Sequence, residues 1–437
     1  MKRLLLIFAL IGAIVSVSAR ETLSLKHCIA IGIDNNLSLK MAEGEVRKGK
    51  QTISENRAKL LPQINAVAGF NDNFDPPVSV TDGTAYGKLY NITQTLQFNS
   101  SAGLQLQMPL YNAMAFTAVE IARMVDKLNT LSYEKAKEDL VIQISRMYYM
   151  LQNTEEQVKL VYENIARLKE LRDITQAFYD NDMAVEVDVK RVNINLENMQ
   201  VQYDNAVSML EQQYNMLKYV IDYPAEAEIA VEPVHQEDFS PVRFSGFDTN
   251  QYELQMLQTQ QSLAEKQEKL ARQGYLPTLS LNGNWTYSAY TDRFKNWFHS
   301  GESNHWYRSN GLGVSLRVPV FDGFEKRAKI RKAKIDVQTA KTSYENTLKN
   351  MQTQYLNAVN DLDNSCRNYK KQKDNWLLAE DVYKMTFERY REGIASMTEV
   401  LQDEMRMSDA QNNYLNARYN CQLSNLTMLK LTGQLYR

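Results

Sequence analysis

The amino-acid sequence predicts a mainly α-helical protein with a small β part and an internal duplication. Three observations support this fold class. A segment that has the pattern of a strand, a proline and a helix start occurs twice, at 103–110 and 313–320. Each proline is followed by a long stretch with apolar residues about every 3.5 positions, which is typical of coiled-coil helices. Other segments alternate apolar and polar residues, as strands with one apolar face do.

The first nineteen residues have the pattern of a secretory signal peptide. Lys2 and Arg3 precede an apolar run, and a small-residue pattern ends at Ala19. We therefore expect residues 1–19 to be removed and the mature chain to be exported. Beyond Ala19, no apolar stretch approaches the roughly 20 residues that a membrane-spanning helix needs. Any contact with a membrane should come from strands or from an amphipathic face.

The duplication extends well beyond the first pair of segments. The stretch "RAKLLPQI" (57–64) aligns with "RQGYLPTL" (272–279), and "FYDNDMAVEVDV" (178–189) aligns with "RYREGIASMTEV" (389–400). Each half of the chain then has the same order: helix, Leu-Pro, strand, loop, strand, proline, long helix, short turn, helix.

This order divides the mature chain into two structural repeats, 20–221 and 248–437. The segment 222–247 between them holds three of the nine prolines together with acidic residues. We expect it to be a linker with little regular structure, because proline and acidic clusters favour loops.

The prolines also bound the helices, since proline disrupts a helix interior. The first repeat should contain helices at about 22–60, 112–179 and 186–221, and the second at about 248–275, 322–391 and 397–432. Apolar residues keep a heptad spacing along 140–168 and again along 189–220. The turn between these stretches is short, so we expect each long helix and the helix after it to form an antiparallel coiled-coil hairpin.

Two strand hairpins are expected, at 63–108 and 278–318. Leu279, Leu281 and Trp285 alternate with polar residues, which is the pattern of an outer-membrane β-barrel strand. Four strands cannot close a membrane barrel, because such barrels have about eight strands or more and open edges are not tolerated in lipid. Two copies would give eight strands and three copies twelve. A conduit needs the wider barrel, which favours three copies.

A different class of protein fits part of these patterns. A periplasmic or surface coiled-coil scaffold without a pore would explain the heptads but not the paired alternating strands. The near-neutral net charge of −2 gives no electrostatic case for nucleic acid as a partner.

No enzymatic site is expected from the sequence. The chain has no G-x-S-x-G, H-E-x-x-H or phosphate-loop motif, so we assign no catalytic residue and no cofactor. His299 and His305 lie near Glu302, but two histidines without a cluster of further ligands make a poor metal site. We therefore expect no bound metal.

Cys366 and Cys421 lie at similar distances before and after the second turn, so they should lie at similar heights on the second helical hairpin. Packed helix axes are about 8–10 Å apart, whereas a disulfide needs Cα atoms within about 7 Å. We therefore expect two buried free thiols.

Over essentially its whole mature length the chain resembles the TolC-like outer-membrane efflux proteins. The matching pieces are the two Leu-Pro segments, "QMPLYN" and "RVPVFDG" before the long helices, the two turn motifs at 178–189 and 389–400, and "MLKLTGQLYR" at the end. The resemblance implies a homotrimer in the outer membrane of a Gram-negative bacterium. It implies a transmembrane barrel of twelve strands and a periplasmic α-barrel of twelve helices. Such a channel passively conducts small molecules or exported polypeptides in a tripartite efflux or type I secretion system. Its partners are a periplasmic adaptor protein and an inner-membrane transporter, and the transported substrate cannot be identified from the chain.

The resemblance also implies which residues form the periplasmic gate, where acidic side chains and polar links narrow the tunnel. It places Asp188 in the first turn region and Tyr390, Gly393 and Glu399 in the second, with a Tyr390–Asp188 hydrogen bond as a candidate latch. Three positions depart from the family pattern. They are Asp182 in place of the glycine of the first turn, Ala395 in place of a basic residue, and Gln402 in place of a second acidic residue.

Overall fold

The computed structural model describes residues 21–82, 84–87, 89–233, 246–295 and 306–435. The signal peptide and both loop histidines of the sequence analysis lie outside these ranges. The described chain is mainly helical with a small sheet part, which confirms the fold class. None of its helices is both long and apolar enough to cross a membrane.

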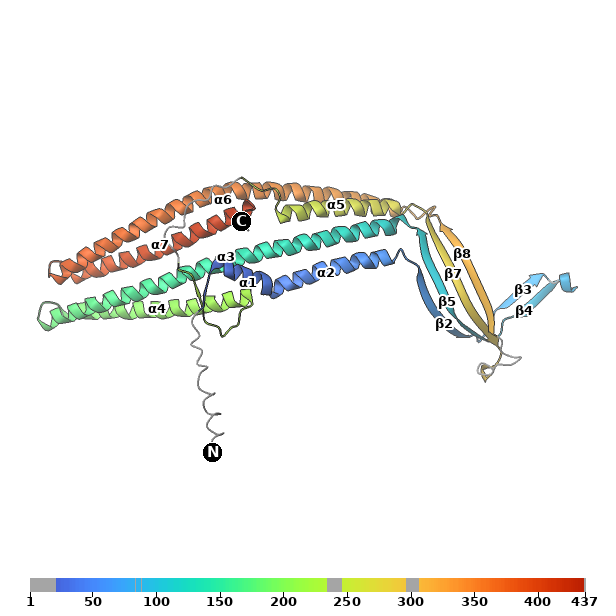
Figure 1. Cartoon of the computed structure of the whole chain (residues 1–437), viewed down its shortest axis with the longest axis horizontal. Helices are drawn as coiled ribbons and strands as arrows, with labels where there is room; N and C mark the ends of the chain where they lie inside the picture. Colours follow the sequence, from blue (N-terminus) through green and yellow to red (C-terminus); the bar gives the residue numbers. More distant parts are fainter. Residues whose placement is uncertain (1–20, 83, 88, 234–245, 296–305, 436–437) are drawn as a thin grey trace, which may run out of the picture. The chain divides into compact units, whose positions relative to one another are not determined.

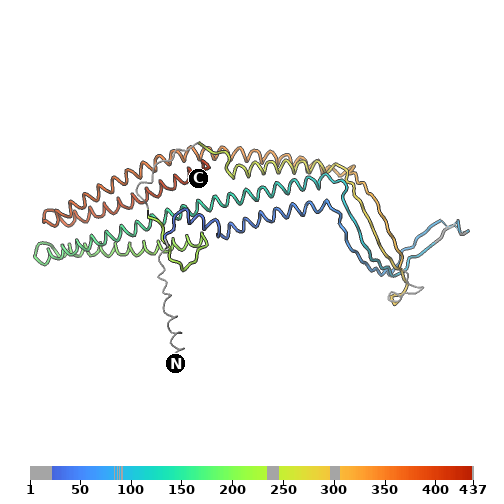
Figure 2. Tube along the Cα trace, viewed as in Figure 1, coloured from blue at the N-terminus to red at the C-terminus, as the bar shows by residue number. Residues whose placement is uncertain are grey.

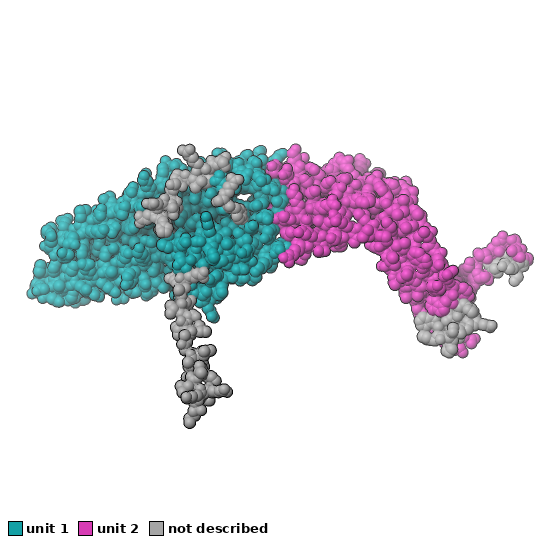
Figure 3. All heavy atoms as spheres, in the orientation of Figure 1, with its two compact units in different colours: residues 1–44, 131–255, 345–437 teal, residues 45–130, 256–344 magenta. Residues whose placement is uncertain are grey.

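The chain divides into two compact units (Figure 3). Unit 1 comprises residues 1–44, 131–255 and 345–437, and unit 2 comprises residues 45–130 and 256–344. Both sequence repeats contribute to each unit, because the two longest helices belong partly to one unit and partly to the other. A division by compactness therefore differs from the division by sequence duplication.

Unit 1 contains two helical hairpins (Figure 1). In the first, α3 (Ala113–Asp180) is followed by α4 (Glu186–Ile221), and in the second, α6 (Glu325–Arg391) is followed by α7 (Met397–Leu431). The heptad positions predicted from the sequence supply the buried face, because residues spaced three and four apart lie on one side of a helix. The fully or almost fully buried members include Ile144, Leu151, Leu168, Val192 and Leu217.

The turns that end α3 and α6 have the same backbone geometry. Asp182 and Gly393 each adopt a left-handed conformation, with φ of 59° and 74°. In each turn this residue donates its backbone N–H three residues back, and the next residue donates five residues back. This pattern is the Schellman motif, which usually has glycine at the left-handed position because a Cβ is unfavourable there. Aspartate is among the few other residues that adopt this conformation readily.

One helix expected at about 22–60 is two helices in the structure, α1 (Leu25–Asn35) and α2 (Leu37–Ala58). The break is at Asn36, whose Oδ1 accepts the backbone N–H of Leu39 at 3.0 Å and whose Nδ2 donates to the Val220 carbonyl at 2.7 Å. An asparagine side chain that bonds to backbone groups competes with the helical hydrogen bonds and favours a cap. The expectation of one continuous helix was therefore wrong.

The expected linker also contains regular structure. Strand β6 (Ile229–Val231) pairs in parallel with β1 (Glu21–Leu23) in unit 1. Tyr148 fixes this pair to α3, because its hydroxyl donates to the Leu23 carbonyl at 3.0 Å and accepts the Glu232 N–H at 2.9 Å. The segment was expected to have little regular structure, and β6 is its one strand among the described residues; residues 234–245 lie outside the described chain.

Unit 2 contains a four-stranded antiparallel sheet with the order β2-β5-β7-β8. Its strands are β2 (Gln63–Asp72), β5 (Phe98–Tyr111), β7 (Thr278–Thr291) and β8 (Trp306–Arg317). Each predicted hairpin contributes two strands, and β5 pairs with β7 to join the hairpins. A second small sheet was not expected. It consists of β3 (Val78–Asp82) and β4 (Tyr90–Gln94), with a 3₁₀ turn at Thr84–Tyr86 between them.

Next to the sheet, the helical segments of unit 2 lie side by side in pairs (Figure 2). Here α2 lies alongside α3, and α5 (Tyr252–Gln273) lies alongside α6. Gly49 allows the close approach of α2 to α3, because a Cβ at this position would lie 2.7 Å from Asp126 Oδ1. Lys266 Nζ donates to Glu120 Oε2 at 2.8 Å and so joins α5 to α3.

A disulfide joins Cys366 on α6 to Cys421 on α7, with Cα atoms 5.0 Å apart. The expectation of two free thiols was therefore wrong. It compared the distance between helix axes with a limit for Cα atoms. Each Cα lies about 2.3 Å from its helix axis, so facing residues on helices with axes about 8–10 Å apart come within disulfide range. Cys28 is a free and buried cysteine.

This pairing predicts the thiol count of the mature protein. After denaturation without a reductant, alkylation should label one cysteine per chain, Cys28, and after reduction it should label all three. The measurement is intact mass after alkylation. Labelling of three cysteines without reduction would contradict the disulfide. The Cys28→Ser variant is the control, and its unreduced form should take up no label.

Candidate functional site: the helix turns and the contacts between the hairpins

Two of the expected gate residues lie at the turn between α6 and α7. Gly393 is exposed and holds the left-handed position of that turn. Glu399 is exposed in the first turn of α7, where its N–H donates to Ser396 Oγ at 3.3 Å and its carboxylate accepts the Ser396 hydroxyl at 3.2 Å. Ser396 is thus the N-cap of α7, and its hydroxyl oxygen satisfies one of the free backbone donors at the start of the helix. Glu399 therefore stabilises the start of α7 while its carboxylate remains accessible to water.

Asp188 lies in the first turn of α4. Its side chain is 22% exposed, and its carboxylate lies 3.2 Å from the guanidinium of Arg191. An acidic residue at a helix N-terminus is also favoured by the helix dipole. Asp188 is thus held by neighbours on its own helix.

Tyr390 links the two hairpins. It is 5% exposed, and its hydroxyl lies 2.9 Å from Thr175 Oγ1 on α3. The Thr175 hydroxyl donates to the Leu171 carbonyl at 2.8 Å. The Thr175 oxygen is then free to accept, so the Tyr390 hydroxyl is the donor between the two side chains. The ring of Tyr390 packs on Phe178, with centroids 5.5 Å apart.

The expected Tyr390–Asp188 hydrogen bond does not form between these two described residues. Tyr390 is bonded to Thr175 and Asp188 to Arg191. Burial raises the pKa of Tyr390, the hydrogen bond with Thr175 opposes this, and the negative charge of Asp188 adds to it slightly. The buried core face of α6 directs the Tyr390 side chain toward α3, which the alignment of turn motifs did not reveal.

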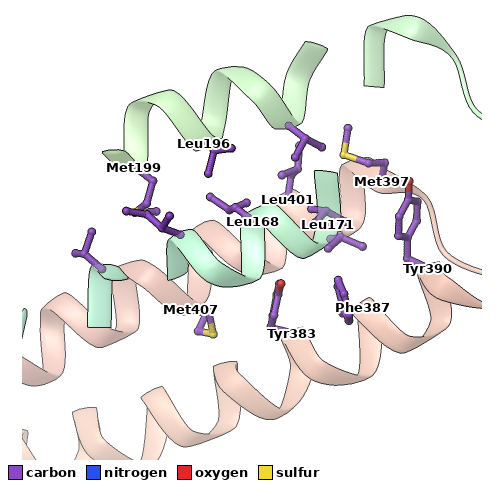
Figure 4. Packing of buried hydrophobic residues seen from close by; sticks show 14 residues of the cluster. Leu168, Leu171, Leu196, Met199, Tyr383, Phe387, Tyr390, Met397, Leu401 and Met407 are labelled. Atoms are coloured by element: carbon purple, nitrogen blue, oxygen red, sulfur yellow. The ribbon is translucent and has the colours of Figure 1, made fainter. Parts of the chain in front are cut away.

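Tyr390 is also a member of an apolar cluster (Figure 4). The cluster takes residues from all four helices of the two hairpins, and Leu168, Leu171, Val192, Val400 and Met407 are among its most deeply buried members. Burying a side chain of this size stabilises a fold by about 1.5–3 kcal/mol. The two hairpins of unit 1 therefore share one core.

Beside this core, polar side chains connect α3 to α7. Asn164 Nδ2 donates to Gln411 Oε1 at 2.8 Å, and Asn164 Oδ1 accepts a hydrogen bond from the Arg167 guanidinium. Further along, Arg418 donates to Asn153 Oδ1 at 3.2 Å. We refer to Asn164, Arg167, Glu404 and Gln411 as the inter-hairpin polar cluster. The sequence analysis missed these residues, although Glu404, Gln411 and Arg418 recur every seven positions along α7 and so share one face of the helix.

Glu404 is the acidic member of this cluster and is 3% exposed. Its Oε1 and the Nε of Arg167 are buried and lack hydrogen-bond partners among the described residues. Burial raises the pKa of Glu404 to about 7, while the positive charge of Arg167 opposes this and Asp409 adds slightly to it. Burial raises the pKa of Tyr383 on α6, the positive charge of Arg167 opposes this, and the charge of Glu404 adds to it. Glu404 therefore changes its charge near neutral pH, at the junction of three helices.

The described residues contain no group of three or more histidines, cysteines or acidic residues that could hold a metal ion. The arrangement offers neither a nucleophile paired with a base nor a ligand cage. It provides a core and a set of polar links between the two helical hairpins.

Comparison with known proteins identifies the class. The family model described as "Outer membrane efflux protein" matches residues 32–221 and 248–434, and the chain belongs to this family. It is an outer-membrane efflux duct of a Gram-negative bacterium, with its helical part in the periplasm. The matched ranges include both helical hairpins and all four strands of the main sheet.

Individual relatives are similar over almost their whole lengths. The chain is 22% identical to the outer membrane protein TolC of Vibrio cholerae, covering 88% of this chain and 85% of that protein. It is also 22% identical to TolC of Escherichia coli, covering 92% and 80%. Among solved structures, the outer membrane protein VceC of Vibrio cholerae superposes with a TM-score of 0.76 at 16% identity, covering 94% of this chain and 96% of that one.

The buried carboxyl group of Glu404 predicts a pH-dependent stability. Because its pKa in the folded chain, about 7, lies above the ordinary value of 4.5, the folded chain retains a proton that the unfolded chain has released between these pH values. Stability is therefore lost as the pH rises through this window, by about 3 kcal/mol per chain. The substitution Glu404→Gln should thus raise the free energy of unfolding relative to wild type, and this gain should be larger at pH 8 than at pH 5.

The measurement is thermal or denaturant unfolding of the purified protein at both pH values. Glu392→Gln is the matched control, because Glu392 is exposed near the second turn, and we expect it to show no such difference. Equal effects of Glu404→Gln at pH 5 and pH 8 would show that Glu404 does not change its charge in this range.

Proposed function

We propose that three copies of the chain form the duct and that their sheets close into one transmembrane barrel. The observation that supports this proposal is the four-stranded sheet itself. Its outer strands, β2 and β8, each pair on one side within the chain, and the residues of both are almost all exposed. An open strand edge is not tolerated in the hydrocarbon region of a membrane, because its backbone groups would lack hydrogen-bond partners.

The strand directions fit such a closure. Every neighbouring pair in the sheet is antiparallel, and the number of strands is even, so β8 runs opposite to β2. β8 of one copy can therefore pair with β2 of the next in the same antiparallel manner. Three copies of the four strands then give twelve, a barrel wide enough for an aqueous channel.

A scaffold without a pore is the alternative class, and the sheet disfavours it. Such a scaffold would leave the apolar side chains Leu312, Val314 and Leu316 of β8 in water, where they are 71%, 62% and 65% exposed in the single chain. A row of this kind on one face of an antiparallel strand is typical of lipid contact.

The duct works with a periplasmic adaptor protein and an inner-membrane transporter. This part of the proposal rests on the family and on relatives whose names describe them as outer membrane proteins of a toluene or an antibiotic efflux pump. The transporter supplies energy and selects the cargo, and the duct conducts passively. We assign the chain no catalytic step, no cofactor and no metal.

We place the gate at the helix turns of unit 1. The Tyr390–Thr175 hydrogen bond and the shared core hold the two hairpins of each chain together, so a resting channel would keep the turns in place. Asp188 and Glu399 supply negative charge at the start of α4 and α7, and Gly393 provides the flexible left-handed position between α6 and α7. Opening would then require the hairpins to separate.

The native mass of the complex tests the duct. The protein is extracted in mild detergent from an isolated outer-membrane fraction, and native mass spectrometry gives the number of chains. We expect a detergent-dependent species of three chains. A monomer or dimer recovered from the soluble periplasmic fraction would contradict both the barrel and the channel.

The inter-hairpin hydrogen bond predicts a gating phenotype. Tyr390→Phe and Thr175→Val each remove the bond with little change in shape. Because such a bond contributes about 1 kcal/mol, either variant should raise the resting conductance of the reconstituted channel severalfold. The double variant should add little further, because both changes remove the same bond.

Single-channel recording in planar bilayers is the measurement for this prediction. Tyr162→Phe is the matched control, because Tyr162 on α3 is mostly exposed, and its conductance should equal that of wild type. Wild-type conductance in both Tyr390→Phe and Thr175→Val would exclude this bond from the gate.

A further inference from the structure

Two rows of carboxamide side chains cross one face of the four-stranded sheet. In the first row the strand register aligns Asn65 on β2 with Gln105 on β5, Gln105 with Asn284 on β7, and Asn284 with Gly311 on β8. The neighbouring row lies two residues along each strand and therefore on the same face. We call these two rows the carboxamide belt: Asn65, Gln105, Asn284 and Gly311, with Gln63, Gln107, Asn282 and Gly313.

The belt is locally ordered. Asn282 Nδ2 donates to Ser315 Oγ on the neighbouring strand at 2.8 Å. The carboxamide of Asn284 lies over Gly311, where an added Cβ would be 2.6 Å from Asn284 Oδ1. The glycine is thus needed for this amide to lie against the sheet. Side chains of both rows line a hollow of about 500 Å³.

The belt face is almost free of charge. Alternate residues of β2, β5, β7 and β8 on this face are amides, hydroxyl residues, glycines and a few apolar or tyrosine residues. Within these four strands, the one side chain of this face that is charged at neutral pH is Arg317, at the end of β8. The amides themselves have no titratable group, so the belt stays uncharged at any physiological pH.

The opposite face of the same strands is mainly apolar, with Asp72 and Arg308 as its charged side chains near one end of the sheet. Ile64, Leu104 and Leu312 alternate with the belt residues, and all are exposed in the single chain. In a closed membrane barrel the apolar face contacts lipid and the polar face lines the interior. The belt therefore faces the bore, an assignment that rests on the proposed trimeric duct.

We propose that the carboxamide belt makes the barrel bore indifferent to charge, so that it passes hydrated solutes of either sign and discriminates by size. Each carboxamide both donates and accepts hydrogen bonds, so it can replace part of the hydration of an anion, a cation or a neutral polar group. A ring of fixed charges would instead favour one sign and raise a barrier to the other. Gln105 and Asn284, on the two central strands of the sheet, determine this property.

Charge selection then falls to the helical part of the duct. The turns of unit 1 carry acidic side chains, among them Asp182, Asp188 and Glu399. A cargo that has passed them meets no second electrostatic filter at the belt. The substrate class of the barrel is therefore broader than that of the gate.

The experiment places one thiol in the belt without adding charge. The trimer of the Gln105→Cys variant is incorporated into a planar bilayer. Two methanethiosulfonate reagents, one with a quaternary ammonium group and one with a sulfonate, are added in turn from the barrel side. Each labelling rate is divided by the rate of the same reagent with a small free thiol. The disulfide-bonded pair and buried Cys28 make wild type the background control.

We expect both reagents to react, with normalised rates within about threefold of each other, because an uncharged belt creates little local potential. The attached charges should then shift the potassium-to-chloride permeability ratio in opposite directions. Leu104→Cys is the matched control, because Leu104 is adjacent in sequence but lies on the apolar face. Its thiol should react with neither charged reagent.

Each other outcome has a definite meaning. The native mass of the Gln105→Cys protein is measured first, and a single chain in place of three would overturn the proposed duct itself. A trimer in which the sulfonate reagent reacts more than about tenfold more slowly than the ammonium reagent would overturn the charge-indifferent belt, because a tenfold ratio corresponds to a difference of about 1.4 kcal/mol between the two opposite charges. Reaction of Leu104→Cys and not of Gln105→Cys would show that the faces are reversed. If Gln105→Cys fails to assemble, Thr286→Cys on the same face of β7 takes its place in each comparison.

Discussion

The pairing of backbone groups at the two edges of the four-stranded sheet is the constraint on which the rest of the structure depends. Inside a membrane no water is present to bond to a free strand edge, so β2 and β8 need partners that one chain does not provide. The same requirement fixes the even number of strands, the antiparallel order and the division into an apolar and a polar face. Duplication meets this requirement economically, because each repeat supplies one hairpin and β5 and β7 join the two.

Much of the fold could be predicted because its signals are repetitive. Heptads run along α3 and α4, and prolines mark where the long helices begin, so helix type and position follow from local pattern alone. The sheet is predictable for the same reason, since apolar and polar residues alternate along much of its strands. What the sequence analysis missed depends on single residues. Asn36 breaks a helix through bonds to two backbone groups, and β3 and β4 are five residues each, too short to give a strong periodic signal.

The candidate site was less predictable, because its contacts join residues far apart in the chain. The turn motifs located Asp188, Tyr390 and Glu399, but no motif states which side chain a buried tyrosine will meet. Thr175 is separated from Tyr390 by 215 residues, and a threonine within a long helix gives no sign of such a role. The disulfide was missed for a geometric reason, since facing Cα atoms on packed helices lie much closer together than the helix axes do. The buried polar residues of α7 recur at heptad spacing, where an analysis that follows apolar residues alone overlooks them.

The contacts between the two hairpins of unit 1 combine opposite tendencies. The apolar cluster favours a firmly packed state, whereas buried polar groups contribute little net stability because of the cost of removing them from water. A packed interface with incompletely satisfied polar groups, such as Glu404 and Arg167, is held less firmly than an apolar one of the same size. An interface of this kind suits a channel that must remain closed at rest and yet open under a modest load.

The two helix turns have equal backbone geometry but different chemistry, since Asp182 occupies the position that Gly393 holds in the other repeat. In an assembly of three chains, the six turns then alternate between one that bears a carboxylate and one that bears no side chain. The backbone of this ring then has approximately sixfold symmetry, whereas its side chains have threefold symmetry. A protein that binds such a ring would meet two kinds of turn, and a rotation by a single position would exchange a carboxylate for a bare glycine at every contact.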